Sequence, residues 1–217
     1  KTGDFLWYNI KMNNNNNTPK DVFMHLLSMI ALYISAGSLI ALLFQYINIY
    51  FPDALQPVYY SGVAGTIRWA MAALMIIFPI YLAVMHLLNQ DYEASPEKKD
   101  LKIRKWLVYF TLFVAALIIS TDLVTLVYNF LGGELTARFL LKVLTVAGVI
   151  GTVFLYYGID LKDGLTKKRV NMFLILTAGF VALSVIGGFF TAGSPLKARL
   201  HRFDEQRVAD LQTIQYQ

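Results

Sequence analysis

The stretch TIRWAMAALMIIFPIYLAVMHLL, residues 66–88, carries no lysine, arginine, aspartate or glutamate after Arg68. An α-helix rises about 1.5 Å per residue, so roughly 20 apolar residues cross the hydrocarbon core of a bilayer. In lipid the backbone must satisfy its own hydrogen bonds, which a helix does within a single segment. Residues 66–88 therefore predict a transmembrane helix.

Four more apolar blocks of similar length are separated from this one by short polar or charged segments. They cover residues 22–49, 104–130, 136–158 and 170–191. The strands of a membrane barrel would alternate apolar and polar residues instead of forming continuous runs. The predicted fold class is an all-α integral membrane protein with five transmembrane helices, a four-helix domain plus one.

The composition agrees with a membrane protein and narrows its chemistry. Hydrophobic residues make up 57% of the 217 residues and charged residues 15%, against about 25% charged in soluble domains. There is no cysteine, so disulfides and thiolate sites are excluded. We assign the net charge of +5 to loops beside lipid headgroups and not to nucleic-acid binding. No nucleotide-binding, HExxH or Gly-x-Ser-x-Gly motif occurs, so we expect neither an enzyme nor a cofactor.

The chain divides into four predicted parts. Residues 1–20, which include five consecutive asparagines, form a disordered leader or an extension. Residues 21–160 form the four-span membrane domain, and residues 161–193 supply a cytoplasmic loop and the fifth span. The first apolar block is too long for the core of a cleavable signal peptide, so it is expected to remain as a span.

Residues 194–217 form the fourth part. Ser194 and Pro195 are typical of a helix start, and apolar side chains recur after them at nearly helical spacing. This pattern predicts an amphipathic helix outside the membrane that contacts a partner protein. Its predicted contact face consists of Leu200, Phe203, Leu211 and Ile214.

Basic residues are unevenly shared between the two sides of the predicted spans, and loops rich in lysine and arginine stay in the cytoplasm. We therefore predict a multi-pass protein of the bacterial inner membrane with a cytoplasmic N-terminus and an extracytoplasmic C-terminus. The side richer in basic residues holds Lys11, Lys20, Lys98, Lys99, Lys102, Arg104, Lys105, Lys162, Lys167, Lys168 and Arg169. The cluster KKDLKIRK, residues 98–105, is expected to contact anionic lipid headgroups through Lys98, Lys99, Lys102, Arg104 and Lys105.

The first four spans resemble a known family. The resemblance rests on DVFMHLLSMIALY (21–33), LLFQYIN (42–48), IRWAMAALMIIFPIYL (67–82), LKIRKWLVYFTLFVAA (101–116), DLVTLVYNFLGGELTARFLLKV (122–143) and YY-x-x-DL (156–161). In these segments the chain resembles the bacterial domain-of-unknown-function family 5671, a small multispan membrane domain. The resemblance implies a compact four-helix membrane domain and brings no reaction, ligand or catalytic residue.

A second resemblance concerns the tail RFDEQRVADLQTIQ, residues 202–215. It is similar to the segment that opens the soluble head of type IV pilin-like proteins. The fifth span has no Gly-Phe pair followed by a glutamate five residues into the helix, as the filament subunits have. The resemblance therefore implies the start of a pilin-like head on a multispan anchor.

Asp122 lies in the middle of the block 104–130, where a lone carboxylate is expensive and must be paired, protonated or facing water. Residues 104–130 and 136–158 should form an antiparallel hairpin about Gly132 and Gly133, which puts Lys142 at a depth similar to that of Asp122. Arg68 approaches from the same side of the membrane. These three residues are the predicted buried polar cluster, interpreted either as a structural ion pair or as a proton or ion relay.

His25 and His86 both lie near the cytoplasmic ends of neighbouring antiparallel spans. Two membrane histidines at one depth can ligate haem, or they can simply contact headgroups and backbone. The preferred function is a membrane-embedded scaffold or anchor subunit that presents its extracytoplasmic tail to other subunits of a pilus or secretion-type assembly. The alternatives are a small proton- or ion-coupled transporter centred on Asp122 and a bis-histidine haem protein.

Overall fold

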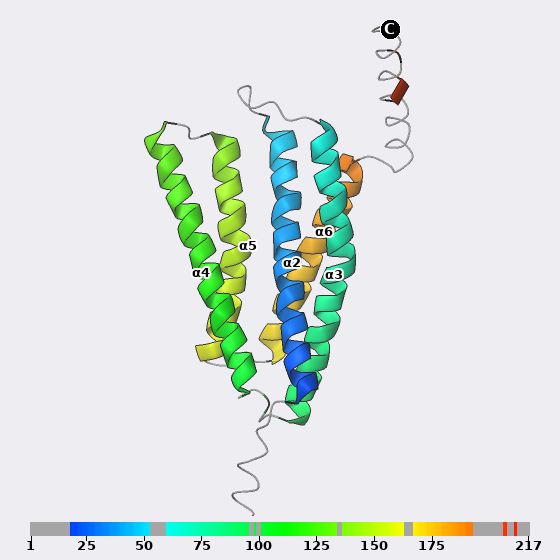
Figure 1. Ribbon diagram of the computed structural model, residues 1–217, viewed down its shortest axis with the longest axis vertical. Helices are drawn as coiled ribbons and strands as arrows, with labels where there is room; N and C mark the ends of the chain where they lie inside the picture. Colours follow the sequence, from blue (N-terminus) through cyan, green and yellow to red (C-terminus); the bar gives the residue numbers. More distant parts are fainter. Residues whose placement is uncertain are drawn as a thin grey trace, which may run out of the picture.

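The computed structural model describes residues 18–52, 60–95, 98, 101–133, 136–162, 167–192, 206–207 and 211. Most of these residues lie in five long helices, labelled in Figure 1. The helices are α2 (Pro19–Tyr50), α3 (Tyr60–Ala94), α4 (Lys102–Leu131), α5 (Ala137–Lys162) and α6 (Lys167–Ala192). Each is long and apolar enough to cross a membrane, so the prediction of five apolar helices is confirmed.

The helices extend beyond the apolar blocks that predicted them. The largest difference is in α3, which starts six residues before the predicted stretch 66–88 and ends six residues after it. Hydropathy locates only the part of a helix that fits hydrocarbon, whereas the backbone can continue as a helix into the polar region. The last turns of α3 therefore carry Asp91 and Tyr92.

Local chemistry sets two of the helix ends. The hydroxyl oxygen of Thr18 accepts a hydrogen bond from the backbone N–H of Asp21 at 3.3 Å, and Pro19 occupies the first turn, as expected at a capped N-terminus. After α4, Gly133 adopts a φ of 73°, which glycine reaches without steric penalty. The predicted glycine turn between these two helices is confirmed.

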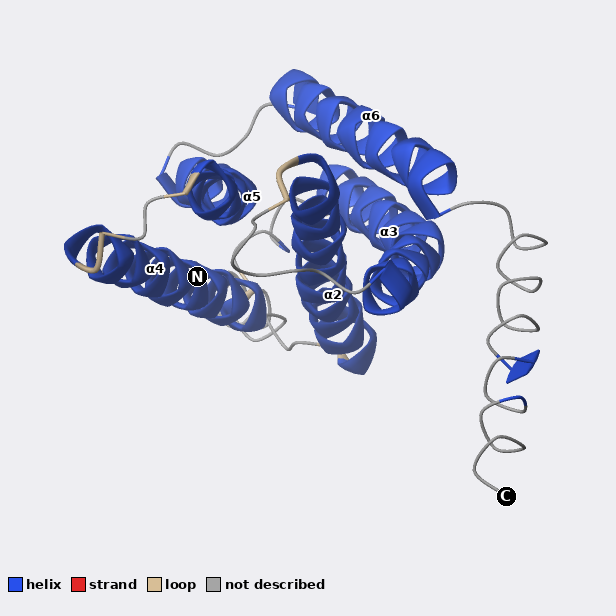
Figure 2. Ribbon diagram, turned by 90° about the horizontal axis from the view of Figure 1, so that it is seen from above, coloured by secondary structure: helices blue, strands red, loops and turns tan. Residues whose placement is uncertain are grey.

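α2 is the central helix of the bundle and contacts α3, α4, α5 and α6. α3 and α6 pack on one side of it, and the α4–α5 hairpin lies on the other (Figure 2). Successive helices run in opposite directions (Figure 1). The start of α2 and the end of α6 therefore lie at opposite ends of the bundle.

The tightest core joins α2, α3 and α6. Leu42 of α2 and Ile67 and Leu74 of α3 are almost completely buried. A Cβ atom added at Gly188 of α6 would clash with the side chain of Met71. A glycine at this position therefore lets α6 approach α3 closely, as small residues do in membrane helix pairs.

α4, the first helix of the α4–α5 hairpin, is the least buried of the five spans and exposes much apolar surface. The hydroxyls of Tyr33 on α2 and Thr111 on α4 are 2.8 Å apart. The outer face of α4 presents large apolar and aromatic side chains: Trp106, Tyr109, Phe113, Val124, Tyr128 and Leu131. Such a face requires contact with a bilayer or with another apolar helix.

Only Gln206, Arg207 and Leu211 are described in the tail, and all three are helical and exposed. The other members of the predicted partner-contact face, Leu200, Phe203 and Ile214, lie outside the described residues. That face therefore stays a prediction.

Candidate functional site

Alternating helix directions bring five helix ends together at the end of the bundle where α2 begins (Figure 1). α3 and α5 end there, and α4 and α6 begin there. The segment that connects α3 to α4 passes this end through Lys98. Charged residues that look like separate span boundaries in the sequence are therefore neighbours in space, and they form the main polar cluster among the described residues.

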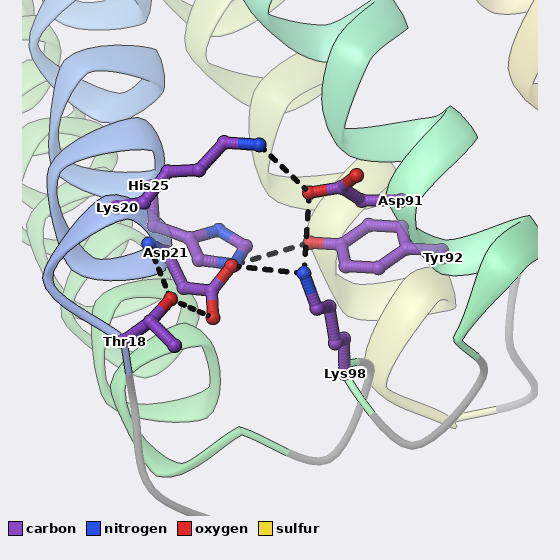
Figure 3. Close-up of polar contacts among 7 residues, drawn as sticks. All are labelled: Thr18, Lys20, Asp21, His25, Asp91, Tyr92 and Lys98. Atoms are coloured by element: carbon purple, nitrogen blue, oxygen red, sulfur yellow. Dashed lines mark hydrogen bonds and ion pairs between the residues drawn. The ribbon is translucent and has the colours of Figure 1, made fainter.

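The first part of the cluster, the Asp21 clamp, consists of Asp21, Lys98 and Asp91 (Figure 3). Lys98 Nζ lies 3.2 Å from Asp21 Oδ1 and 3.3 Å from Asp91 Oδ2. Lys20 Nζ approaches the same Asp91 oxygen at 4.0 Å. Asp21 lies in the first turn of α2, and Asp91 lies in the last turn of α3. Lys98 therefore connects both helix ends to the segment that leads into α4.

Asp21 is the buried member of the clamp, with 5% of its surface exposed. Its second oxygen accepts a hydrogen bond from the Thr18 hydroxyl at 2.6 Å. Its position in the first turn of α2 also places it near the positive end of the helix dipole. The hydrogen bond to Asp21 raises the pKa of Lys98 above its ordinary value of 10.5, so the ammonium stays charged at neutral pH.

The second part of the cluster, the Tyr92 stack, consists of His25, Tyr92, Arg104 and Asp160. The rings of His25 and Tyr92 are stacked with centroids 6.1 Å apart, and the Tyr92 hydroxyl is 3.4 Å from His25 Nε2. The Arg104 guanidinium lies 5.4 Å from the Tyr92 ring centroid, in cation–π geometry. Arg104 also forms an ion pair with Asp160 at the end of α5.

A cavity of about 60 Å³ adjoins the Tyr92 stack. His25, Tyr92, Arg104 and Asp160 all contribute to its walls. This volume suits one or two waters and no larger ligand. Within the described part of the chain, no three histidine, aspartate or glutamate side chains gather as metal ligands would. The ring stacking, the cation–π contact and the ion pair of the cluster join α2, α3, α4 and α5.

The structure does not bring together the predicted buried cluster of Asp122, Lys142 and Arg68. Asp122 forms no ion pair with either cation among the described residues. Its Oδ2 atom is shielded and has no hydrogen-bond partner there. Arg68 is exposed on α3.

Lys142 instead faces α2, with its Nζ atom 5.5 Å from the centre of the Phe44 ring. Arg138, one helical turn earlier on α5, donates from Nε to Asn48 Oδ1 on α2 at 3.0 Å. Residues four apart share a helix face, so both α5 cations face α2. The equal depth of Asp122 and Lys142 in the hairpin does not determine how α5 is rotated about its own axis.

The two span histidines occupy different surroundings. His25 is 3% exposed and belongs to the Tyr92 stack. His86 is exposed on α3, and its Nε2 lies 3.0 Å from Gln90 Nε2 on the same helix. The structure therefore places the two imidazoles in different hydrogen-bonded surroundings, one buried and one exposed.

The basic segment 98–105 also departs from its predicted arrangement. Lys98 and Arg104 turn into the bundle and pair with Asp21, Asp91 and Asp160. Lys102 and Lys105 are exposed, while Lys99 lies outside the described residues. Headgroup contact stays a prediction for the cluster, while Lys98 and Arg104 are engaged by acidic residues of the chain.

The sequence reasoning overlooked Asp21, Asp91, Tyr92 and Asp160. One signal could have found three of them: the carboxylates fall at the ends of predicted spans on the same side as the KKDLKIRK cluster. Opposite charges at one face of a bundle are candidates for pairing, because a nearby opposite charge favours the charged form of a partly buried group.

Comparison with known proteins concerns the same part of the chain. No curated protein and no solved structure matches the chain. The family described as "Domain of unknown function (DUF5671)" matches residues 21–157. The match begins at Asp21 and includes both parts of the cluster except Asp160. Because it covers more than half of the chain, the protein belongs to the DUF5671 family.

Proposed function

We propose that this protein is a membrane-embedded scaffold or anchor subunit, which assembles with another membrane protein through α4. It spans the bacterial inner membrane five times, with its N-terminus in the cytoplasm and its C-terminal segment outside. There it presents its tail to partner subunits, as in a pilus or secretion-type assembly. The Asp21 clamp and the Tyr92 stack then hold the cytoplasmic ends of the helices in place.

The observation that carries this proposal is the shielded Asp122 oxygen without a hydrogen-bond partner among the described residues. A carboxylate at the centre of a membrane helix costs about 2.5–3.5 kcal/mol on insertion scales. Other acidic residues of the described helices, Asp21, Asp91 and Asp160, are engaged by cations. Oδ2 is out of reach from outside, but the residue as a whole is half-buried, so a basic or amide side chain on a partner helix would give the carboxyl group the same compensation through its other oxygen.

The surface of α4 supports the same proposal. Asp122 shares this helix with large exposed apolar side chains, among them Val124 and Tyr128, which are 68% and 76% exposed. At 3.6 residues per turn, Val124 and Tyr128 lie about 120–160° around the helix from Asp122, so they form a separate apolar face that offers a packing surface to a partner helix. α4 is also the helix least buried within the chain, so it offers the most surface to a partner.

The transporter alternative uses the same carboxylate but requires it to bind and release a proton or ion through a water path. The haem alternative requires two facing imidazoles, and His25 and His86 are engaged with Tyr92 and Gln90 instead. The scaffold is therefore the function that the arrangement supports best.

The test is affinity purification of the tagged full chain from native membranes in mild detergent. A co-purifying membrane protein is expected with the wild type and should be lost with Asp122→Asn and Asp122→Leu. Asn129→Leu is the matched control, because Asn129 is a polar residue of α4 that donates to the backbone oxygen of Thr125 at 2.8 Å. It should retain the partner.

A second measurement separates scaffold from transporter. The purified chain is reconstituted into vesicles that carry a pH gradient, and proton flux is recorded. The scaffold predicts no flux above that of empty vesicles. Flux that disappears in Asp122→Asn would overturn the scaffold and establish the transporter.

A further inference from the structure

A second, much larger cavity lies between α2, α5 and α6. Its volume is about 670 Å³, within the range of roughly 300–1,000 Å³ typical of ligand sites. Within the described part of the chain, α5 and α6 do not pack against each other, and seen from above they stand apart (Figure 2). Leu144 of α5 and Leu176 of α6 line the cavity and are more than half exposed. The mouth of the cavity therefore opens sideways between these two helices.

The interior of the cavity suits hydrocarbon. Most of its lining side chains are those of leucine, valine, phenylalanine and tyrosine. The three threonines in its walls, Thr145, Thr152 and Thr177, each donate their hydroxyl to a backbone oxygen one turn earlier. The Ser35 hydroxyl is shielded. Protein interiors are close-packed, so a space of this size, open to the bilayer, is a place for a chain of methylene groups.

The dimensions of the cavity fit an acyl chain better than a partner helix. Its lining on α5 runs from Leu141 to Tyr157, about 24 Å along the helix at 1.5 Å per residue. The hydrocarbon layer of one leaflet is about 15 Å deep, half of the whole core, so a chain from one leaflet fits within this length. A transmembrane helix about 10 Å across and 30 Å long fills roughly 2,400 Å³, more than three times the cavity.

Two cations lie in line with the mouth, at the end of the bundle where α5 ends and α6 begins. Lys162 follows Leu144 by about five helical turns, and Arg169 precedes Leu176 by about two turns. Each cation therefore shares a helix face with the leucine at its edge of the mouth. Lys162 and Arg169 are exposed, and neither forms an ion pair among the described residues. The segment 162–169 as a whole contains four basic residues and one acidic residue.

The two cations also stand at the height of a phospholipid headgroup. The lining residues nearest to this end are Tyr157 of α5 and Phe173 of α6. They lie about 6–8 Å along their helices from Lys162 and Arg169 at 1.5 Å per residue. The polar layer on each side of a bilayer is about 5–8 Å thick, since the whole bilayer is about 40–45 Å and its core about 30 Å. A lipid with its chain in the cavity therefore places its phosphate beside these cations.

We propose that the cavity binds an acyl chain of an anionic phospholipid, whose phosphate is held by Lys162 and Arg169. Basic pockets between membrane helices suit such headgroups. The bound lipid fills the gap between α5 and α6, so it connects two helices that do not contact each other directly. This inference goes beyond the scaffold function and needs only the membrane location.

The test is lipid binding to the purified, delipidated full chain in detergent, counted by native mass spectrometry. The chain is titrated with dioleoyl phosphatidylglycerol, which is anionic, or with dioleoyl phosphatidylcholine, which has the same chains and no net charge. The first phosphatidylglycerol should bind with a dissociation constant at least tenfold lower than that of the first phosphatidylcholine. Glycerol 3-phosphate, which has the phosphate without the chains, should not displace it.

One pair of double variants tests the headgroup contact. A basic residue near a membrane surface contributes about fivefold to the binding of anionic lipid, so Lys162→Gln with Arg169→Gln should weaken phosphatidylglycerol binding by about 10- to 30-fold. Phosphatidylcholine binding should not change. Lys102→Gln with Lys168→Gln is the control, because it removes the same charge from the same end of the bundle. Lys168 shares its helix face with Ile175, which is exposed and does not line the cavity. The control should keep the preference for phosphatidylglycerol.

A second pair of variants tests the cavity. A Cβ at Gly148 or at Gly179 meets no atom within 4 Å, but only Gly148 lines the cavity. Gly148→Phe should weaken the first binding event of both lipids at least tenfold, because its ring takes the place of the chain. Gly179→Phe, on an exposed part of α6, should bind both lipids like the wild type.

Several outcomes would overturn the proposal. Equal binding of the two lipids to the wild type would mean that the mouth selects no headgroup. Equal losses in the two double variants would assign the preference to the overall surface charge. Wild-type binding by Gly148→Phe, or displacement of the lipid by glycerol 3-phosphate, would mean that the chain does not enter the cavity. Asp122→Asn should leave lipid binding unchanged, so failure of the scaffold function and failure of this site are separate results.

Discussion

Lys98 Nζ and Asp21 Oδ1 lie 3.2 Å apart, although 77 positions separate these residues in the chain. The contact joins the segment before α4 to the first turn of α2. Asp21 is 5% exposed and its carboxylate has lost most of its hydration, so the nearby cation compensates for a real desolvation cost. This pair holds the first hairpin of the bundle to the second.

Lys98→Met should destabilise the protein by about 1–3 kcal/mol. Removing one partner of a fully buried pair costs about 3–5 kcal/mol, and the effect is smaller here because a third of the Lys98 side chain is exposed. Thermal unfolding in detergent measures the change. Lys102→Met, at an exposed lysine of α4, is the control and should unfold like the wild type. Equal unfolding temperatures for the two variants would contradict a role for the clamp in stability.

The same contact predicts how stability changes at alkaline pH. The hydrogen bond to Asp21 raises the pKa of Lys98 above its ordinary value of 10.5. A raised pKa in the folded state contributes stability that is complete below the unfolded pKa and is lost as the pH rises through the folded value. The difference in unfolding temperature between wild type and Lys98→Met should therefore be constant from pH 7 to pH 9 and shrink above pH 10.5. A difference that shrinks already between pH 7 and pH 9 would exclude this assignment.

Arg104 should tolerate lysine poorly, because a lysine cannot both lie flat over Tyr92 and reach Asp160. The stacked guanidinium contributes about 1 kcal/mol through cation–π contact, so Arg104→Lys is expected to lose about that amount. Arg104→Leu alone should lose more, since it leaves Asp160 without its cation. The double variant Arg104→Leu with Asp160→Leu should recover much of the loss, as apolar replacement of a buried pair often does. If the double variant is no more stable than Arg104→Leu, the pair with Asp160 is not the main contribution of Arg104.

The five helices could be predicted because their signal is local. A run such as residues 66–88 is apolar over the width of a bilayer whatever surrounds it, and Gly132 and Gly133 mark a turn by their own conformational freedom. The polar cluster could not be predicted in this way. Asp21, Asp91 and Asp160 each follow or precede an apolar run, and each alone is indistinguishable from a solvated boundary residue.

The partners of Asp122 and Lys142 could not be predicted, because the sequence pattern does not give the rotation of each helix about its axis. Counting residues from a turn gives the depth of a side chain in a helical hairpin. It does not give the rotation of each helix about its axis, which depends on packing against α2. Arg138 and Lys142 lie one turn apart and both contact α2, through Asn48 and Phe44. Their spacing was a usable signal that the two cations share a face.

Membrane orientation is a further prediction, and it rests on the lysine and arginine asymmetry of the loops. Protease added to intact spheroplasts should remove a tag placed after Gln217 and spare a tag placed before Lys1. Protease added after the spheroplasts are lysed is the control and should remove both tags. Protection of the C-terminal tag with loss of the N-terminal one would reverse the proposed orientation and place the polar cluster outside the cell.

The last prediction concerns Asp122 and Lys142. Their similar depth in the membrane predicted an ion pair, but the structure does not bring the two side chains together. Asp122 Oδ2 has no hydrogen-bond partner among the described residues, so Asp122→Leu should leave the isolated protein at least as stable as the wild type. Lys142→Met removes the contact with the Phe44 ring and should cost about 0.5–2 kcal/mol.

The double variant decides between independent and paired residues. If the two side chains do not interact, the effects of Asp122→Leu and Lys142→Met on unfolding in detergent should add within about 0.5 kcal/mol. A buried ion pair would instead make each single variant strongly destabilising, by about 3–5 kcal/mol, and the double variant much milder. Arg104 with Asp160 serves as the positive control, because that pair should show the non-additive pattern. Additive effects at 122 and 142 beside coupled effects at 104 and 160 would mean that Asp122 and Lys142 do not interact in the isolated protein.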